Sequence, residues 1–188
     1  MILEGVVTTL NGDGVPNISP MGPHIDGGIQ RFVLKPYRTS RTYANLKRSP
    51  VGVFHITDDV ELLARAAVDA LQTPPAMRRV LDGQAVILSD ACRWYAFRVT
   101  KLDDDQERTR IECQVTECGR QRDFLGFNRA KHAVVEAAIL ATRTNLLPRQ
   151  HILDEFCRLL TIVEKTAGEQ ERRAFDFLHD YVCKALGR

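Results

Sequence analysis

The sequence predicts an α+β protein in which an antiparallel β-barrel or sandwich, residues 1–120, precedes a helical region, residues 121–188. Two patterns indicate this class. Short Val- and Thr-rich runs separated by glycine and aspartate turns fill the first part, as in antiparallel β-proteins. Amphipathic stretches with a helical period fill the second part. We expect those helices to pack on the barrel or on a partner subunit.

The first strands alternate with tight turns. Ile2–Leu10 reads as a strand, Asn11–Gly14 as a hairpin turn and Val15–Pro20 as the returning strand. Two prolines in the returning strand favour an edge position, because proline cannot donate to a sheet. A second glycine turn then leads into Ile29–Lys35, which predicts a third strand.

The later strands surround an alternating hairpin. Val51–Ile56 is almost wholly apolar and predicts a strand buried on both faces. Gln84–Ser89 is also strand-like. Residues 94–100 and 111–115 alternate between apolar and polar side chains, with the acidic turn Asp103–Asp105 between them. This pattern predicts an antiparallel hairpin with one core face.

Five segments predict helices. A short helix over Thr39–Lys47 begins at hydroxyl residues and is stopped by Ser49–Pro50. The tail predicts three longer helices, over residues 129–144, 149–166 and 169–186. The segment 58–71 is predicted to be partly helical.

Composition and charge exclude several classes of protein. A net charge of +2 is too small to indicate a nucleic-acid-binding protein. No segment approaches the roughly 18 apolar residues of a membrane span, and the first ten residues lack a basic start, so we expect a cytoplasmic protein. The five cysteines are odd in number and have no CxxC spacing, which predicts neither disulfides nor a metal site.

The segment from Lys35 to Leu46 carries the richest chemistry. A strand ends, a loop follows, and a helix begins among hydroxyl and guanidinium groups. Backbone N–H groups at a helix start favour anions. The side chains that add donors for a phosphate group are Arg38, Thr39, Ser40, Arg41 and Thr42. The alternative is an ordinary helix cap with solvated basic residues.

Four motifs in order resemble a known family. They are Glu4–Thr9, Asn17–Gly22, Arg38–Pro50 and Phe127–Ala137. The segment from Ser40 through Ser49–Pro50 looks like the Ser-Arg-Lys…Asn-Pro pattern of FMN-binding split barrels, a superfamily that includes pyridoxamine-phosphate oxidases and flavin reductases. Over nearly its full length the chain resembles domain of unknown function family 447.

The resemblance implies a split β-barrel that binds flavin mononucleotide (FMN) at the interface of a homodimer. Ser40, Arg41 and Thr42 would hold the phosphate, with Asn45 steadying the loop. The backbone of Ile18, Ser19, Pro20 and Met21 would lie beside the isoalloxazine ring. Thr42 stands where the superfamily often has lysine, so the remaining phosphate charge would fall to Arg38 or Lys35.

A second polar cluster opens the first tail helix. Asn128 and Arg129 belong to the fourth motif, and Arg129, His132 and Glu136 share one helix face. They could reach the flavin or an anionic substrate, or they could form an exposed, ion-paired surface. His24 could neighbour the flavin or lie in a surface loop, whereas His55, in an apolar strand, is expected to be a hydrogen-bonded core residue.

Three functions remain open at this level. The first is an oxidoreductase in which FMN transfers hydride or electrons to an unknown substrate. The second is a non-catalytic protein that binds or sequesters flavin, and the third is a structural dimer with an empty pocket. No P-loop, dinucleotide fingerprint, zinc-protease motif or nucleophile elbow is present in the sequence.

Overall fold

The structure is a computed structural model that describes residues 1–187, apart from the side chain of Asp26. The chain divides into two compact units. The first comprises Met1–Thr57 and Pro74–Phe124, and the second comprises Asp58–Thr73 and the described residues from Leu125 onward.

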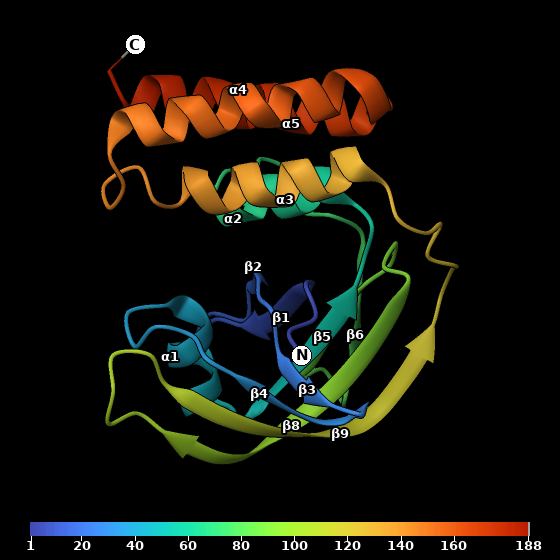
Figure 1. The fold of residues 1–188 in the computed structure, drawn as a ribbon. Helices are drawn as coiled ribbons and strands as arrows, with labels where there is room; N and C mark the ends of the chain where they lie inside the picture. Colours follow the sequence, from blue (N-terminus) through green and yellow to red (C-terminus); the bar gives the residue numbers. More distant parts are fainter. Residues whose placement is uncertain (188) are drawn as a thin grey trace. The chain divides into compact units, whose positions relative to one another are not determined.

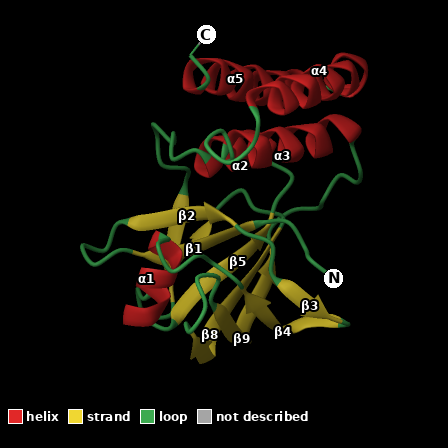
Figure 2. Ribbon diagram, turned by 60° about the vertical axis from the view of Figure 1, so that its left-hand side comes forward, coloured by secondary structure: helices red, strands yellow, loops and turns green. Residues whose placement is uncertain are grey.

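The first unit is built on one seven-stranded antiparallel sheet with the strand order β2-β1-β5-β8-β9-β4-β3. Figure 2 shows how strongly these strands curl around one another. The strands are β1 (Val6–Leu10), β2 (Pro16–Pro20), β3 (His24–Asp26), β4 (Gly28–Leu34), β5 (Val51–Ile56), β8 (Arg93–Asp103) and β9 (Arg110–Arg120). A short hairpin, β6 (Met77–Val80) and β7 (Ala85–Leu88), forms a separate two-stranded sheet.

The two edges of the large sheet come together at one end. Edge strands β2 and β3 are joined only by residues 21–23, and the N-terminal residues run beside this connection. The N–H of Leu3 donates to Pro23 O at 3.2 Å, and the N–H of Met21 donates to Gly5 O at 2.9 Å. The sheet is therefore a barrel that is closed at this end by the N-terminal segment, as expected of a split barrel.

The barrel interior is packed with aromatic and aliphatic side chains. Phe32, Phe54 and Phe97 meet there, with ring centroids 5.2–6.0 Å apart in the two pairs that Phe32 makes. On the outer face, β7 covers β1 and β5, and Ile87 joins a second cluster with Trp94. Both faces of β5 are consequently buried, which confirms the expectation drawn from its apolar run.

The predicted β-elements are confirmed with small shifts at their ends. The expected strands over 2–10, 15–20, 29–35, 51–56 and 84–89 correspond to β1, β2, β4, β5 and β7, and the alternating hairpin to β8 and β9. Strands β3 and β6 are additions. Both are short, and β6 carries two adjacent arginines in the sequence MRRV, so neither shows an apolar run.

The second unit is a bundle of four helices. Figure 1 shows α2 and α3 in one layer and α4 and α5 in the other. The helices are α2 (Val60–Ala67), α3 (Arg129–Ala141), α4 (Arg149–Thr166) and α5 (Glu169–Ala185). Small alanines of α3 face larger side chains such as Phe156 and Phe175, whose ring centroids are 5.5 Å apart.

The segment 58–73 belongs to this bundle, although the sequence placed it in the β-rich part. Val60, Leu63 and Ala64 of α2 are buried in the same core as α3 and α5, because their spacing gives α2 one apolar face. Among residues 1–187, no helix has the length and apolar character needed to span a membrane.

Candidate functional site

The short helix α1 (Arg41–Arg48) follows β4 after a six-residue loop, as the sequence predicted. Ser40 is its N-cap, and the Ser40 hydroxyl oxygen accepts the N–H of Tyr43 at 3.2 Å. The N–H groups of Arg41 and Thr42 have no acceptor within the helix, as at every helix start. No acidic residue lies in the first turn, and Arg38, Thr39 and Arg41 are exposed around it. This start is chemically suited to an anion.

Buried polar contacts fix α1 against the hairpin of β1 and β2. The side-chain amide of Asn17, on β2, donates to Thr42 Oγ1 at 3.1 Å. Asn45 Nδ2 donates to Thr9 Oγ1 at 3.0 Å and to Asn11 Oδ1 at 2.9 Å. Thr42 and Asn45 are 1% and 3% exposed, so both side chains face the hairpin. Thr42 can offer a phosphate its backbone N–H, and Asn45 holds the helix in place.

The turn between β8 and β9 is hydrogen-bonded to the loop that precedes α1. The N–H of Arg38 donates to Glu107 O at 2.9 Å, and Thr109 donates to Pro36 O through both its N–H and its hydroxyl, at 3.0 and 2.9 Å. The guanidinium of Arg108 lies 4.6 Å from the ring centroid of Tyr37. The conformation of the loop is therefore set by contacts from a hairpin about seventy residues away in sequence.

An ion pair adds a second link between α1 and this turn. Asp104 accepts from the Tyr43 hydroxyl at 2.5 Å and from Lys47 Nζ at 2.7 Å. The hydrogen bond from Lys47 and then that from Tyr43 lower the pKa of Asp104 to about 2, and Asp104 raises the pKa of Lys47 in return. The acidic turn, read from sequence only as a turn, thus has a part in positioning α1.

Strand β2 lies next to the start of α1. Ile18, Ser19, Pro20 and Met21 follow Asn17, whose side chain contacts Thr42, and all four are half-buried. β2 pairs with β1 on one side and is an edge of the sheet on the other. The structure therefore brings together the segment expected to flank a flavin ring and the helix start expected to hold its phosphate.

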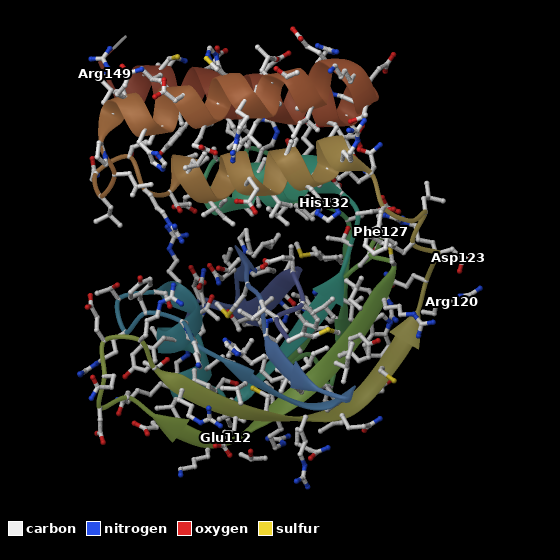
Figure 3. All side chains as sticks on the ribbon, in the orientation of Figure 1. Glu112, Arg120, Asp123, Phe127, His132 and Arg149 are labelled. Carbon is white, nitrogen blue, oxygen red and sulfur yellow. The ribbon has the colours of Figure 1, made fainter. Side chains whose placement is uncertain are left out.

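Asn128 and Arg129 lie in the second unit. Asn128 is the N-cap of α3: its Oδ1 accepts the N–H of Lys131 at 3.0 Å, and its Nδ2 donates to Thr166 O at 3.1 Å. Arg129 is exposed on the first turn. In the same turn, the ring of His132 stacks on Phe127, with centroids 6.0 Å apart (Figure 3). Their part in a flavin site stays a prediction.

The two remaining histidines of interest lie on the sheet. His24 is half-buried at the start of β3, where burial and then the charge of Lys35 lower its pKa. His55 is fully buried on β5 and hydrogen-bonded through both ring nitrogens, to Val6 O and to the N–H of Leu88. This confirms that His55 is a satisfied core residue.

Sequence reasoning missed the residues that connect these parts. Asn17 opens one of the four family motifs, but its contact with Thr42 joins segments that are distant along the chain. The hydrogen-bonded turn at residues 107–109 carries no motif. The one available signal was Asn17 itself, a polar residue within a predicted strand.

The fold is shared with split-barrel flavoproteins of known structure. The flavin reductase of styrene monooxygenase from Pseudomonas putida S12 superimposes with a TM-score of 0.51 at 13% identity, over 63% of this chain and 81% of that one. A flavin reductase domain protein from Arthrobacter sp. FB24 gives 0.54 at 18% identity, over 64% and 79%. The curled sheet is thus a split β-barrel of the flavin-reductase type.

A further solved structure matches both units. The FMN-bound DUF447 protein from Methanosarcina mazei has a TM-score of 0.83 at 21% identity, over 96% of this chain and 94% of that one. The chain belongs to the DUF447 family: the model described as "Protein of unknown function (DUF447) N-terminal domain" matches residues 3–122, and that described as "Protein of unknown function (DUF447)" matches residues 128–180. This confirms the resemblance seen in the motifs. A search of curated proteins found no match.

Proposed function

We propose that this protein binds FMN, with the phosphate at the start of α1 and the isoalloxazine ring along β2. The observation that carries the proposal is the hydrogen bond from Asn17 on β2 to Thr42 on α1, at 3.1 Å. It places the helix start and the edge strand side by side, as a ligand with a phosphate at one end and a planar ring at the other requires.

The phosphate would be held by donors of several kinds. The backbone N–H groups of Arg41 and Thr42 lie in the first turn of the helix, and the Ser40 hydroxyl and the exposed side chain of Arg41 belong to the same helix start. Arg38 supplies a second cation from a loop whose backbone is fixed by Glu107. No carboxylate lies in the first helical turn to oppose a dianion.

The ring would lie against an edge strand that keeps one flank outside the sheet. Those backbone groups of residues 18–21 that point away from β1 can pair with the polar edge of an isoalloxazine, and Pro20 has no N–H to offer there. The FMN-bound relative from Methanosarcina mazei, whose fold covers nearly the whole chain, supports this choice of ligand.

The proposal extends to the reaction class, with a flavin-dependent oxidoreductase of unknown substrate as the preferred function. Bound FMN would supply hydride or electron transfer, while the protein positions the ring and its reaction partner. Flavin reductases among the structural relatives support this class. The alternative is a protein that binds or sequesters flavin without catalysis.

We also propose a homodimer with the flavin at the subunit interface and a cytoplasmic location. The family resemblance supports the dimer, and sedimentation at equilibrium should give twice the mass of one chain. None of the five cysteines, all within the described residues, forms a disulfide, which is usual for proteins of reducing compartments.

The ligand itself is tested by releasing it from the purified protein and measuring its mass. FMN is the expected result, and a different ligand, or none after incubation with FMN, contradicts the proposal. NADPH added without oxygen then distinguishes the two functions. Bleaching of the flavin absorbance, with reoxidation by an added acceptor, supports the oxidoreductase, whereas an unreactive bound flavin supports sequestration.

A further inference from the structure

A groove of about 750 Å³ lies on the outer face of the barrel, away from the packed interior. It is formed by β3, β4, β8 and β9, and Glu112, one of its residues, lies on the outer side of the sheet in Figure 3. Its polar side chains come mainly from alternate positions of β4 and β9, which face outward while Phe32 and Cys113 face the core. The proposed flavin site uses neither of these strands.

Arg31 is held in a fixed orientation at this groove. Its Nε donates to Gln114 Oε1 at 2.7 Å, and Gln114 Nε2 in turn donates to Gln30 O at 3.0 Å. These two bonds engage only one of the three guanidinium nitrogens. Arg31 can therefore present its terminal N–H groups as an oriented fork, the arrangement that suits carboxylate and phosphate oxygens.

The surroundings are electropositive. Among the described side chains that line the groove, two are cationic, Arg31 and Arg110, and one is anionic, Glu112. Glu112 pairs with Arg110 at 3.3 Å. His24 lies on the same wall, and the charges of Lys35, the N-terminus, Arg110 and Arg108 all act, after burial, to lower its pKa.

The register of β8 extends this positive surface. Arg98 stands opposite Gln114, Lys101 opposite Glu112, and the carboxylate Asp103 opposite Arg110. Residues directly opposite in an antiparallel pair project from the same face of a sheet. All three are exposed, so two more cations and one more carboxylate adjoin the groove from the next strand.

We propose that this groove binds an anionic group, a phosphate or a carboxylate, of a small diffusible ligand, with Arg31 and Arg110 as its cationic contacts. The site is separate from the FMN site and does not depend on it. It would give the protein a place for an anionic substrate or co-substrate on the face of the barrel opposite its core.

Amide NMR spectra of the full-length protein test this proposal. Inorganic pyrophosphate and citrate, each added at constant ionic strength, serve as the phosphate and carboxylate probes. We expect saturable shifts at amides of residues 24–33 and 110–114. A response to pyrophosphate alone assigns a phosphate ligand, and a response to citrate alone assigns a carboxylate ligand. A response to both shows that the groove accepts either group.

Two variants make the test specific. Arg31→Gln should weaken binding about tenfold, the scale of one charge-assisted hydrogen bond, whereas Arg93→Gln, an exposed arginine of β8 outside the groove, should leave it unchanged. Equal weakening by both variants would show only general attraction of charge and overturn the proposal. Shifts confined to residues 38–42, or no saturable shift with either probe, would also overturn it.

Discussion

Protonation of His55 should destabilise the protein in mild acid. The ring is fully buried, its Nδ1 lies 3.2 Å from Val6 O, and its Nε2 lies 3.1 Å from the N–H of Leu88. A carbonyl oxygen only accepts and an amide N–H only donates, so Nδ1 carries the proton and Nε2 is the acceptor. A second proton on Nε2 would meet the Leu88 N–H and break the link between β5 and β7.

The size of the effect follows from the pKa. Burial lowers the pKa of His55 from 6.5 to about 4. Between these values the unfolded chain binds the proton more readily than the folded protein, so the stability present above pH 6.5 is lost as the pH falls toward 4. From pH 7 to pH 5, linkage gives a loss of about 2 kcal/mol in the free energy of unfolding.

Urea unfolding at pH 7 and pH 5 measures this loss. The wild-type protein should lose about 2 kcal/mol more than His55→Gln between the two pH values. His179→Gln, at an exposed position on α5, should behave as the wild type does. Equal losses in the wild type and His55→Gln, or NMR titration of the His55 ring above pH 6, would refute the reasoning.

Three further predictions concern packing and charge. In Gly5→Ala the new Cβ would lie 2.3 Å from the backbone oxygen of His55, so urea unfolding should show a loss of about 1–3 kcal/mol, whereas Gly28→Ala, with open space around it, should show little change. Glu171→Gln removes the 2.7 Å ion pair with Lys131 in the helical bundle and should lower the free energy of unfolding by about 1–3 kcal/mol at pH 7. This loss should shrink in acid, because the pKa of Glu171 is lowered in the folded protein. By NMR titration, Tyr43→Phe should raise the pKa of Asp104, and Lys47→Gln should raise it further, since Lys47 is the larger cause of the shift; the opposite order would contradict the contacts described.

The sequence predicted most of the fold because its signals are local. The glycine turn after β1 and the alternation along β8 and β9 are visible within a few residues. The same holds for Ser40, whose role as a helix cap depends only on its neighbours. Elements without such periodicity, β3 and β6, escaped prediction.

The arrangement of the candidate site depends on contacts between distant segments, which the sequence does not display. The packing of α2 with the C-terminal helices joins residues that are more than sixty positions apart. Asn17 reaches Thr42 only because β2 folds back beside β1. The orientation of Arg31 likewise depends on Gln114 of β9, a strand that lies beside β4 in the sheet but is distant from it along the chain.

The preference for FMN over riboflavin, which lacks the phosphate, tests the central claim most directly. Flavin fluorescence titrations should show FMN binding at least about tenfold more tightly than riboflavin, the scale of one charge-assisted hydrogen bond. Arg41→Ala should reduce that preference while Arg93→Ala preserves it. Equal affinity for the two flavins, or a preference for FMN that survives Arg41→Ala unchanged, would contradict a phosphate site at the start of α1.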